Sequence, residues 1–187
     1  MGKNFYIADL HDSHANVIRF DNRPYKNVGE MNQALIRNWN SVVTNEDTVY
    51  ILGDFCWGKE DRWMEILDQL KGKKVLIRGN HDLKKMSSEL RNKFQDVKDY
   101  KEIKDNGTKV ILSHYPIPFW NGQFRDSVHL YGHVHNTHQW NILENWKKEL
   151  KQLQDLPMRM YNVGVMMSYI NYTPRTLDEI LKGARND

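Results

Sequence analysis

The sequence of 187 residues lacks the features that mark several large classes of protein. Its one cysteine, Cys56, allows no internal disulfide, which indicates a reducing compartment. No apolar run reaches the length that a membrane-spanning helix needs, and the run before Asp9 is too short for a signal peptide. We therefore expect a cytoplasmic protein without a membrane partner.

An excess of charge of either sign is also missing. Lys and Arg number 27 against 24 Asp and Glu, so the formal net charge is only +3. This balance predicts no dedicated nucleic-acid-binding stripe, although a nucleotide or nucleic-acid partner stays open. Repeats, low-complexity stretches and linkers are absent too. We expect residues 1–187 to form a single domain with an ordinary hydrophobic core.

Apolar periodicity in the first half predicts strands that alternate with helices. Short β-favouring runs over 4–8, 48–53 and 74–79 predict strands, and helical spacing over 28–43 and 59–70 predicts helices. An alternation of this kind is typical of an α/β fold.

The second half is richer in strands, which we expect over 99–104, 108–113, 127–131 and 158–163. Asn106-Gly107 predicts a hairpin turn, and Thr176 with Glu179 predicts a capping box that begins a last helix. Residues 139–156 predict an amphipathic helix that Pro157 ends. The apolar stripe of this helix covers either its own domain or a homodimer partner, and consists of Ile142, Leu143, Trp146, Leu150, Leu153 and Leu156.

Polar side chains follow the ends of the expected strands in five places. Ligand sites of α/β folds lie outside the carboxyl ends of strands, so these clusters are expected to converge. In an extended segment, residues two apart point the same way, which would aim the members of two clusters at one point. The five clusters are Asp9-Leu10-His11, Gly53-Asp54, Gly79-Asn80-His81-Asp82, Ser113-His114 and Gly132-His133-Val134-His135.

The clusters supply more metal donors than one ion takes from a protein. Two divalent ions about 3.5–4 Å apart that share a carboxylate suit this number, and phosphate chemistry commonly uses such a pair. Because no thiolate is present, the donors favour Mn, Fe, Co, Ni or Zn in an open site over a structural zinc. The seven donors are Asp9, His11, Asp54, Asn80, His114, His133 and His135.

The five motifs in this order resemble those of the calcineurin-like metallophosphoesterase superfamily over roughly residues 5–135. The resemblance implies a four-layer αββα sandwich in which two mixed β-sheets are flanked by helices. It also implies a dinuclear centre with Asp54 as the bridging ligand. One ion would be held by Asp9, His11, Asp54 and His135, and the other by Asp54, Asn80, His114 and His133.

The same resemblance gives roles to the rest of the GNHD motif. It implies that His81 assists the leaving group while a metal-bridging hydroxide attacks the phosphorus of a phosphodiester or phosphomonoester. Asp82 is expected to fix the orientation of its loop or of the imidazole. The second motif reads GDFCWGK, which lacks the additional Asp and Arg of the phosphoprotein phosphatases, so a phosphodiesterase is favoured over a protein phosphatase, while the choice between phosphomonoester and phosphodiester stays open.

Several interpretations stay open from the residues alone. His14 contacts substrate, caps a helix or is solvated at the surface, and Tyr115, Phe119 and Trp120 either form a substrate wall or pack in the core. A non-catalytic scaffold for protein binding is the alternative function. Since every motif position is filled, the enzyme is the favoured interpretation.

Overall fold

The computed structural model describes residues 2–154 and 158–185. Four short strands, of which the first three contain buried apolar residues, form a first sheet in the order β1-β2-β3-β4, and all of its pairs are parallel. The register places Ile7 beside Ile51 and Ile51 beside Leu76, so that the most apolar ends of these strands are neighbours. The strands are β1 (Asn4–Ile7), β2 (Thr48–Ile51), β3 (Lys73–Ile77) and β4 (Asp96–Lys98).

A second sheet has the order β5-β6-β7-β8, with one antiparallel pair and two parallel pairs. The antiparallel pair turns at Asn106 and Gly107, which both have positive φ angles, as a two-residue hairpin of the primed type requires. The hairpin prediction is confirmed. The strands are β5 (Tyr100–Asp105), β6 (Thr108–Ser113), β7 (Val128–Tyr131) and β8 (Met160–Asn162).

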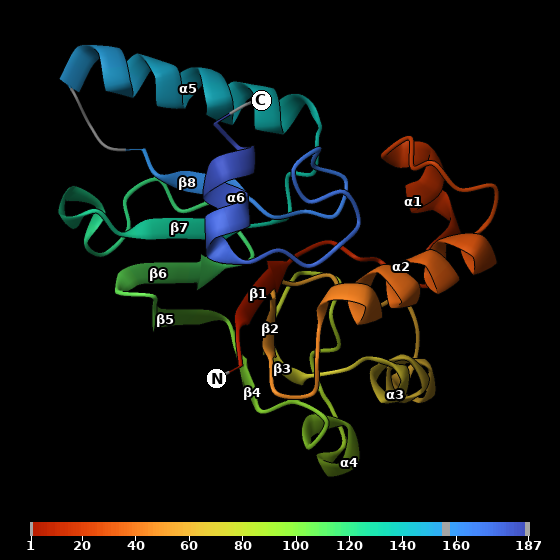
Figure 1. Ribbon diagram of the computed structural model, residues 1–187. Helices are drawn as coiled ribbons and strands as arrows, with labels where there is room; N and C mark the ends of the chain where they lie inside the picture. The colour runs from red at the N-terminus through yellow and green to blue at the C-terminus, as the bar shows by residue number, and fades with distance from the viewer. Residues whose placement is uncertain (1, 155–157, 186–187) are drawn as a thin grey trace.

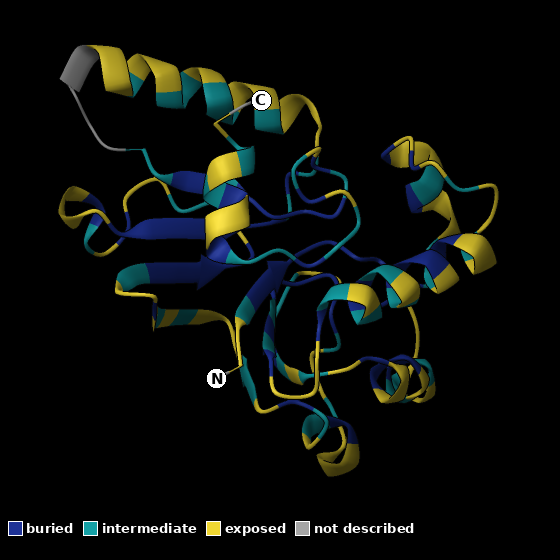
Figure 2. Ribbon diagram, in the orientation of Figure 1, coloured by how far each residue is buried: buried dark blue, intermediate teal, exposed yellow. Residues whose placement is uncertain are grey.

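Helices cover the outer faces of both sheets, which completes the expected four layers (Figure 1). The long helices α2 (Val28–Val42) and α3 (Glu60–Gln69) lie on the first sheet, and α5 (His138–Gln154) lies across the second. Figure 2 shows dark, buried inner strands between helices whose outward surfaces are exposed, whereas β4 and β5 at the sheet edges are largely intermediate or exposed. The α/β fold of two sheets flanked by helices is confirmed, with the refinement that the first sheet is parallel throughout.

The main core lies between the two sheets and continues to the helices on the first. It joins Ile7 and Ile51 of the first sheet to Leu112 and Leu130 of the second. A smaller cluster around Ile111, Met160 and Trp120 lies on the other face of the second sheet, where Trp140, Leu143 and Trp146 of α5 pack. Helix α5 therefore buries part of its apolar stripe against its own chain. Leu156 and Pro157, at the end expected for this helix, lie outside the described residues.

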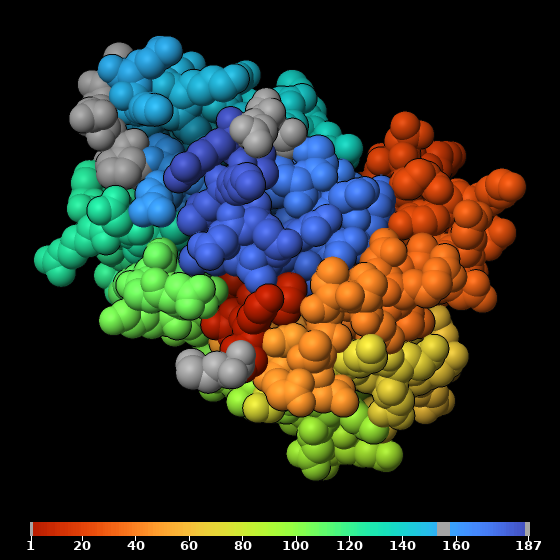
Figure 3. Space-filling view, in the orientation of Figure 1, coloured from red at the N-terminus to blue at the C-terminus, as the bar shows by residue number. Residues whose placement is uncertain are grey.

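The last segment of the chain packs back onto β1 and α2. Its capping box at Thr176 and Glu179 is present and begins α6 (Leu177–Gly183), as predicted. Arg175 bridges Tyr6 of β1, and the side-chain amide of Asn38 donates to the Tyr172 carbonyl at 3.2 Å. On the face shown in Figure 3 this segment lies between α5 and α2.

Four elements were not predicted: α1 (Ala15–Phe20), α4 (Ser88–Arg91), the 3₁₀ helix η1 (Gln123–Arg125) and β4. Each helix has fewer than two turns, so an apolar period cannot emerge from its sequence. Strand β4 contains one apolar residue, Val97, between Asp96 and Lys98. Among the described residues, no helix has the length and apolarity that crossing a membrane demands.

His129 of β7 is fully buried and held in one tautomer. Its Nε2 accepts from the Ile117 N–H at 2.9 Å, while Nδ1 lies 3.2 Å from the Ile111 carbonyl oxygen and donates to it. A second proton would face an N–H group. Burial lowers the pKa of His129 from 6.5 to about 4.

This burial predicts a pH-dependent stability. Between pH 6.5 and about 4 the unfolded chain binds a proton that native His129 does not, so the free energy of unfolding decreases as pH falls through this window. Denaturant titrations at several pH values should show a slope that is shallower in His129→Leu than in the parent protein. If an NMR titration of the imidazole signals showed that native His129 is protonated near pH 6.5, the lowered pKa of His129 would be contradicted.

Candidate metal centre

The donors expected from the sequence all follow strand ends, and the fold brings these ends to one edge. β1, β2 and β3 run parallel in the first sheet, and β6 and β7 run parallel in the second. The two edges are joined where Ala8 donates to the Val163 carbonyl at 2.8 Å and its own carbonyl accepts from the Val165 N–H at 3.0 Å. We call the following residues the donor cluster: Asp9, His11, Asp54, Asn80, His114, His133 and His135.

The backbone of the donor cluster departs from the expected extended conformation. Five of its members have left-handed φ angles between 48° and 69°, a region that residues with a side chain rarely adopt. The predicted extended conformation of these segments is therefore wrong, although the side chains do converge. Such strain, retained at one site, is characteristic of functional positions. The five are Asp9, His11, Asp54, His133 and His135.

Two glycines of the motifs leave space for the carboxylates. A Cβ on Gly79 would lie 2.3 Å from the Asp54 Oδ1, and a Cβ on Gly132 would lie 2.8 Å from the Asp9 Oδ2. Gly79 is not among the glycines with positive φ. Its place in the motif thus reflects the close approach of Asp54 rather than a special turn.

One group of donors gathers around buried Asp9 and consists of Asp9, His11 and His135. The Nε2 atoms of His11 and His135 lie 3.2 Å apart, and the His135 Nε2 lies 4.0 Å from the Asp9 Oδ1. The Oδ2 of Asp54 lies 3.6 Å from the His11 Nε2. These ligand atoms are close enough to hold a single cation.

A second group lies on the other side of Asp54. The same Oδ2 is 3.6 Å from the His114 Nε2, and the Asn80 Oδ1 lies 2.9 Å from both the His114 Nε2 and the His133 Nδ1. Asp9 also approaches this side, because its Oδ1 is 3.9 Å from the His114 Nδ1. Asp54 therefore stands between the two groups, and one of its oxygens is equally distant from an imidazole of each.

The donor cluster fits a cation better than it fits hydrogen bonds alone. The His114 Nδ1 lies 2.8 Å from the Leu52 carbonyl oxygen, so this nitrogen carries the proton and the Nε2 keeps its lone pair. That lone pair faces the oxygens of Asn80 and Asp54, which are acceptors too. A divalent ion between such atoms converts their repulsion into coordination.

Without a cation, burial disfavours the charged forms of the side chains in the donor cluster. It raises the pKa of Asp9 above its ordinary value and lowers the pKa of His11 to about 2. A neutral imidazole is the form that binds a metal, and an ionised carboxylate beside a bound cation is stabilised.

A buried chain of hydrogen bonds through Asp21 and Arg23, which the sequence did not reveal, fixes the orientation of the His135 ring. The His135 Nδ1 donates to the Asp21 Oδ1 at 2.6 Å, and the Asp21 Oδ2 accepts from the Arg23 Nε and Nη2 at 3.0 and 2.8 Å. The Arg23 guanidinium also donates to the backbone carbonyls of Asp9 and Leu10. Burial opposes the charge of both partners, yet the Asp21 carboxylate raises the pKa of His135 and the pKa of Asp21 itself is lowered.

Replacing Asp21 with asparagine is expected to weaken metal binding by roughly 10- to 100-fold, the usual effect of losing a carboxylate behind a histidine ligand. The His135 imidazole would lose the acceptor that aims its Nε2 at the cluster. Calorimetric metal titration of Asp21→Asn, beside the exposed-site control Asp68→Asn on α3, checks this. Equal affinity in the parent and Asp21→Asn, with a native circular dichroism spectrum, would remove the positioning role.

Asp82 lies behind the cluster and contacts backbone groups. Its Oδ2 accepts from the Gly79 and Asp54 N–H groups at 2.7 and 3.0 Å, and its Oδ1 accepts from the Phe55 N–H at 2.9 Å. Burial raises the pKa of Asp82 to about 6, although these N–H donors oppose the shift. The carboxylate thus ties the loop after β2 to the loop after β3.

His81 lies at the open side of the cluster and is exposed. Its backbone N–H donates to the Asp54 Oδ1 at 2.9 Å, and its ring centre is 5.8 Å from that of His11. His14 stands at the N-cap position of α1 but makes no side-chain cap hydrogen bond. Its ring instead stacks on Trp57, with centres 4.4 Å apart and planes inclined by 18°.

Beside the cluster is a cavity of about 460 Å³. Its walls include His11, Asp54 and His81 together with two aromatic residues that the sequence did not single out, Phe20 and Trp57. Of the expected aromatic wall, Tyr115 contacts the His133 ring at 4.5 Å, whereas Phe119 meets Trp146 of α5 and Trp120 is buried. Tyr115 is therefore the member of this set that lies beside the donor cluster, Trp120 packs in the core, and Phe119, which is 68% exposed, lies beside α5.

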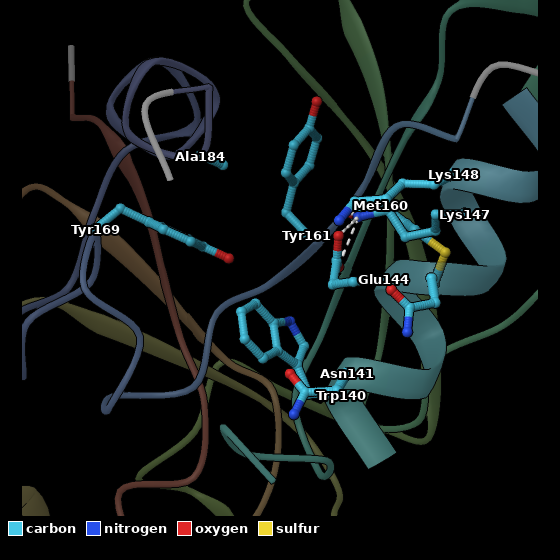
Figure 4. A pocket seen from close by; sticks show the side chains of 10 residues that line it. Trp140, Asn141, Glu144, Lys147, Lys148, Met160, Tyr161, Tyr169 and Ala184 are labelled. Atoms are coloured by element: carbon cyan, nitrogen blue, oxygen red, sulfur yellow. Dashed lines mark hydrogen bonds and ion pairs between the residues drawn. The ribbon is translucent and has the colours of Figure 1, made fainter. Parts of the chain in front are cut away.

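A second hollow of about 380 Å³ lies between α5, β8 and the end of α6 (Figure 4), and none of its lining residues belongs to the donor cluster. Trp140, Tyr161 and Tyr169 surround it. Glu144, the one carboxylate among its described lining residues, is paired with Lys147 at 2.8 Å. This hollow offers no group of metal donors comparable to the cluster.

Comparison with known proteins agrees with this geometry. The sequence pattern of the calcineurin-like phosphoesterase family matches residues 5–163. The chain belongs to this family. Calcineurin-like phosphoesterases are metal-dependent, and the Asp and His groups described above form a candidate site for their divalent ions.

The chain is similar to an archaeal protein, a phage protein and a bacterial protein of known structure. The uncharacterized protein MJ1445 of Methanocaldococcus jannaschii is 36% identical over 184 residues, which cover 97% of this chain and 91% of that protein. The gene 66 protein of Mycobacterium phage L5 is 28% identical over 164 residues, covering 73% of this chain and 79% of that one. The crystal structure of AQ665 from Aquifex aeolicus, a protein of unknown function, has a TM-score of 0.73 and 27% identity, with 97% and 99% of the chains covered.

Proposed function

We propose that this chain hydrolyses a phosphodiester or a small phosphomonoester with two divalent ions, Mn, Fe, Co, Ni or Zn, held by the donor cluster. The observation that supports this best is the position of Asp54, whose Oδ2 is 3.6 Å from an imidazole nitrogen of each donor group. A carboxylate shared in this manner suits two ions rather than one. Asp9, His11 and His135 would hold one ion, and Asn80, His114 and His133 the other.

When bound, such ions neutralise charge on a phosphate and make a nucleophile from water at neutral pH. The protein contributes position and proton transfer. Asp82 and the strained backbone fix the donors, and Asp21 fixes the proton of His135 on Nδ1. His81, exposed over the cavity, assists the departing oxygen by donating a proton or a hydrogen bond. The GDFCWGK motif lacks the residues of phosphoprotein phosphatases, which favours small or nucleotide-like esters over phosphoproteins.

Hydrolysis of bis(p-nitrophenyl) phosphate and of p-nitrophenyl phosphate tests the proposal. The purified protein should be stripped with a chelator and reloaded separately with Mn, Fe, Co, Ni and Zn. We expect no turnover in the stripped protein and restored turnover with at least one metal, with the diester preferred. Bound metal without turnover of either ester would instead support the protein-binding scaffold.

A further inference from the structure

Exposed aromatic side chains gather on one wall of the cavity beside the donor cluster. Phe20 is 62% exposed and Trp57 is 47% exposed, and both line this cavity with His14. Trp57 lies beside the cluster itself, because its ring centre is 5.3 Å from that of His81. Large aromatic residues left open beside a candidate catalytic group are characteristic of a binding surface rather than of a core.

We propose that His14, Phe20 and Trp57, which we call the ring wall, form a subsite for a planar heterocycle of the nucleobase type that the phosphate ester carries. This inference rests on the proposed function, since it names the class of ester that the same site takes. The stacked pair of His14 and Trp57 presents a flat surface, and every nucleobase has a flat face that stacks on such a surface. A cavity of about 460 Å³ accommodates one nucleotide unit.

The location of the ring wall determines which part of the ester it contacts. Trp57 lies beside His81, the group that we place over the departing oxygen. The heterocycle therefore belongs to the leaving group rather than to the part of the ester on the Tyr115 side.

The ring wall is held in place before any ligand binds. The backbone N–H of Trp57 donates to the backbone carbonyl of Asp12 at 2.7 Å, and the Asp12 carboxylate accepts from the Arg62 Nη2 at 3.0 Å. Arg62 of α3 also donates from Nε to the Ser13 Oγ at 2.8 Å, so the loops on both sides of the stacked rings are tied to one helix. A surface ordered in advance loses less conformational entropy on binding.

Equilibrium binding to the metal-loaded protein tests the subsite. The probe is an adenine joined to a phosphonate through an ethoxymethyl tether, compared with the same phosphonate without adenine; the carbon–phosphorus bond prevents hydrolysis of either. We expect the adenine compound to bind roughly tenfold more tightly, the order of one stacked base. Trp57→Ala should bring the ratio of the two dissociation constants near one. Trp57→Leu, which keeps apolar bulk without a flat ring, should do the same.

Phe124→Ala is the matched control, because this phenyl ring is 74% exposed and does not line the cavity. It should keep the parent ratio. Equal binding of the two probes by the parent protein, or a preference that survives in both folded Trp57 variants, overturns the ring wall. Hydrolysis of nitrophenyl esters without any probe preference contradicts the subsite alone, whereas an intact preference without hydrolysis contradicts the proposed function alone.

Discussion

Replacing Asp54 with alanine is expected to empty the donor cluster of metal and to reduce hydrolysis by at least roughly a thousandfold. Its Oδ2 lies 3.6 Å from both the His11 and the His114 Nε2 atoms, so one substitution removes the ligand that the two groups share. Its Oδ1 also accepts from the His81 N–H at 2.9 Å, and this link between the loop after β2 and His81, the proposed general acid, would be lost.

Metal content after dialysis, measured by inductively coupled plasma mass spectrometry, is the readout for Asp54→Ala. Asp54→Asn keeps the side-chain shape without the charge and should also lose metal, which separates ligation from a packing defect. Asp61→Ala, at an exposed position on α3, is the control and should bind as the parent does. Retention of two ions and full turnover in Asp54→Ala would remove the bridging role.

Replacing His81 with alanine is expected to slow turnover by roughly 100- to 10,000-fold while both ions stay bound. The His81 side chain lies at the open side of the cavity, and its imidazole belongs to neither group of candidate metal donors. Proton donation matters most when the leaving alkoxide is basic. The defect should therefore be large for a methyl ester and small for a p-nitrophenyl ester.

The comparison of leaving groups, together with metal analysis, distinguishes a catalytic role from a structural one. A general acid gives a defect that grows with the pKa of the leaving alcohol, whereas a disturbed loop slows all esters alike. His138→Ala, at the exposed start of α5, is the control. Loss of metal from His81→Ala, or equal defects for both esters, would contradict the assignment to the leaving group.

The sequence revealed the parts of the site that local patterns encode. Each motif consists of a buried apolar run followed by Asp, Asn or His, directly or after a Gly or Ser, and such a pattern is visible within about ten residues. The long helices α2, α3 and α5 were visible for the same reason, since each repeats its apolar period several times. The short helices α1 and α4 do not, and they were missed.

The residues that position the donor cluster and its loops, such as Asp21 and Arg23, could not be identified from local sequence patterns. Asp21 contacts His135 across 114 positions, and Arg23 and Arg62 contact loops that only the folded chain brings near. An Asp and an Arg two positions apart are an ordinary surface pair in a sequence. Their burial, with Arg23 at 4% exposure, is decided by packing around α1, a helix that the sequence did not indicate.

The backbone of the site shows the same limit. Local preference favours extended or helical conformations for Asp9, His11 and His133, yet all three have left-handed φ angles. Contacts from both sheets impose these angles, including the His133 N–H, which donates to the Asp9 carboxylate at 3.0 and 3.1 Å. A conformation that one segment alone disfavours cannot be inferred from that segment.

Anomalous diffraction from a crystal grown with manganese tests most directly whether the donor cluster holds two ions. We expect two peaks about 3.5–4 Å apart on either side of Asp54, the separation found in paired metal sites. One should lie among Asp9, His11 and His135, and the other among Asn80, His114 and His133. A single peak, or peaks elsewhere with the cluster empty at saturating manganese, would contradict the account.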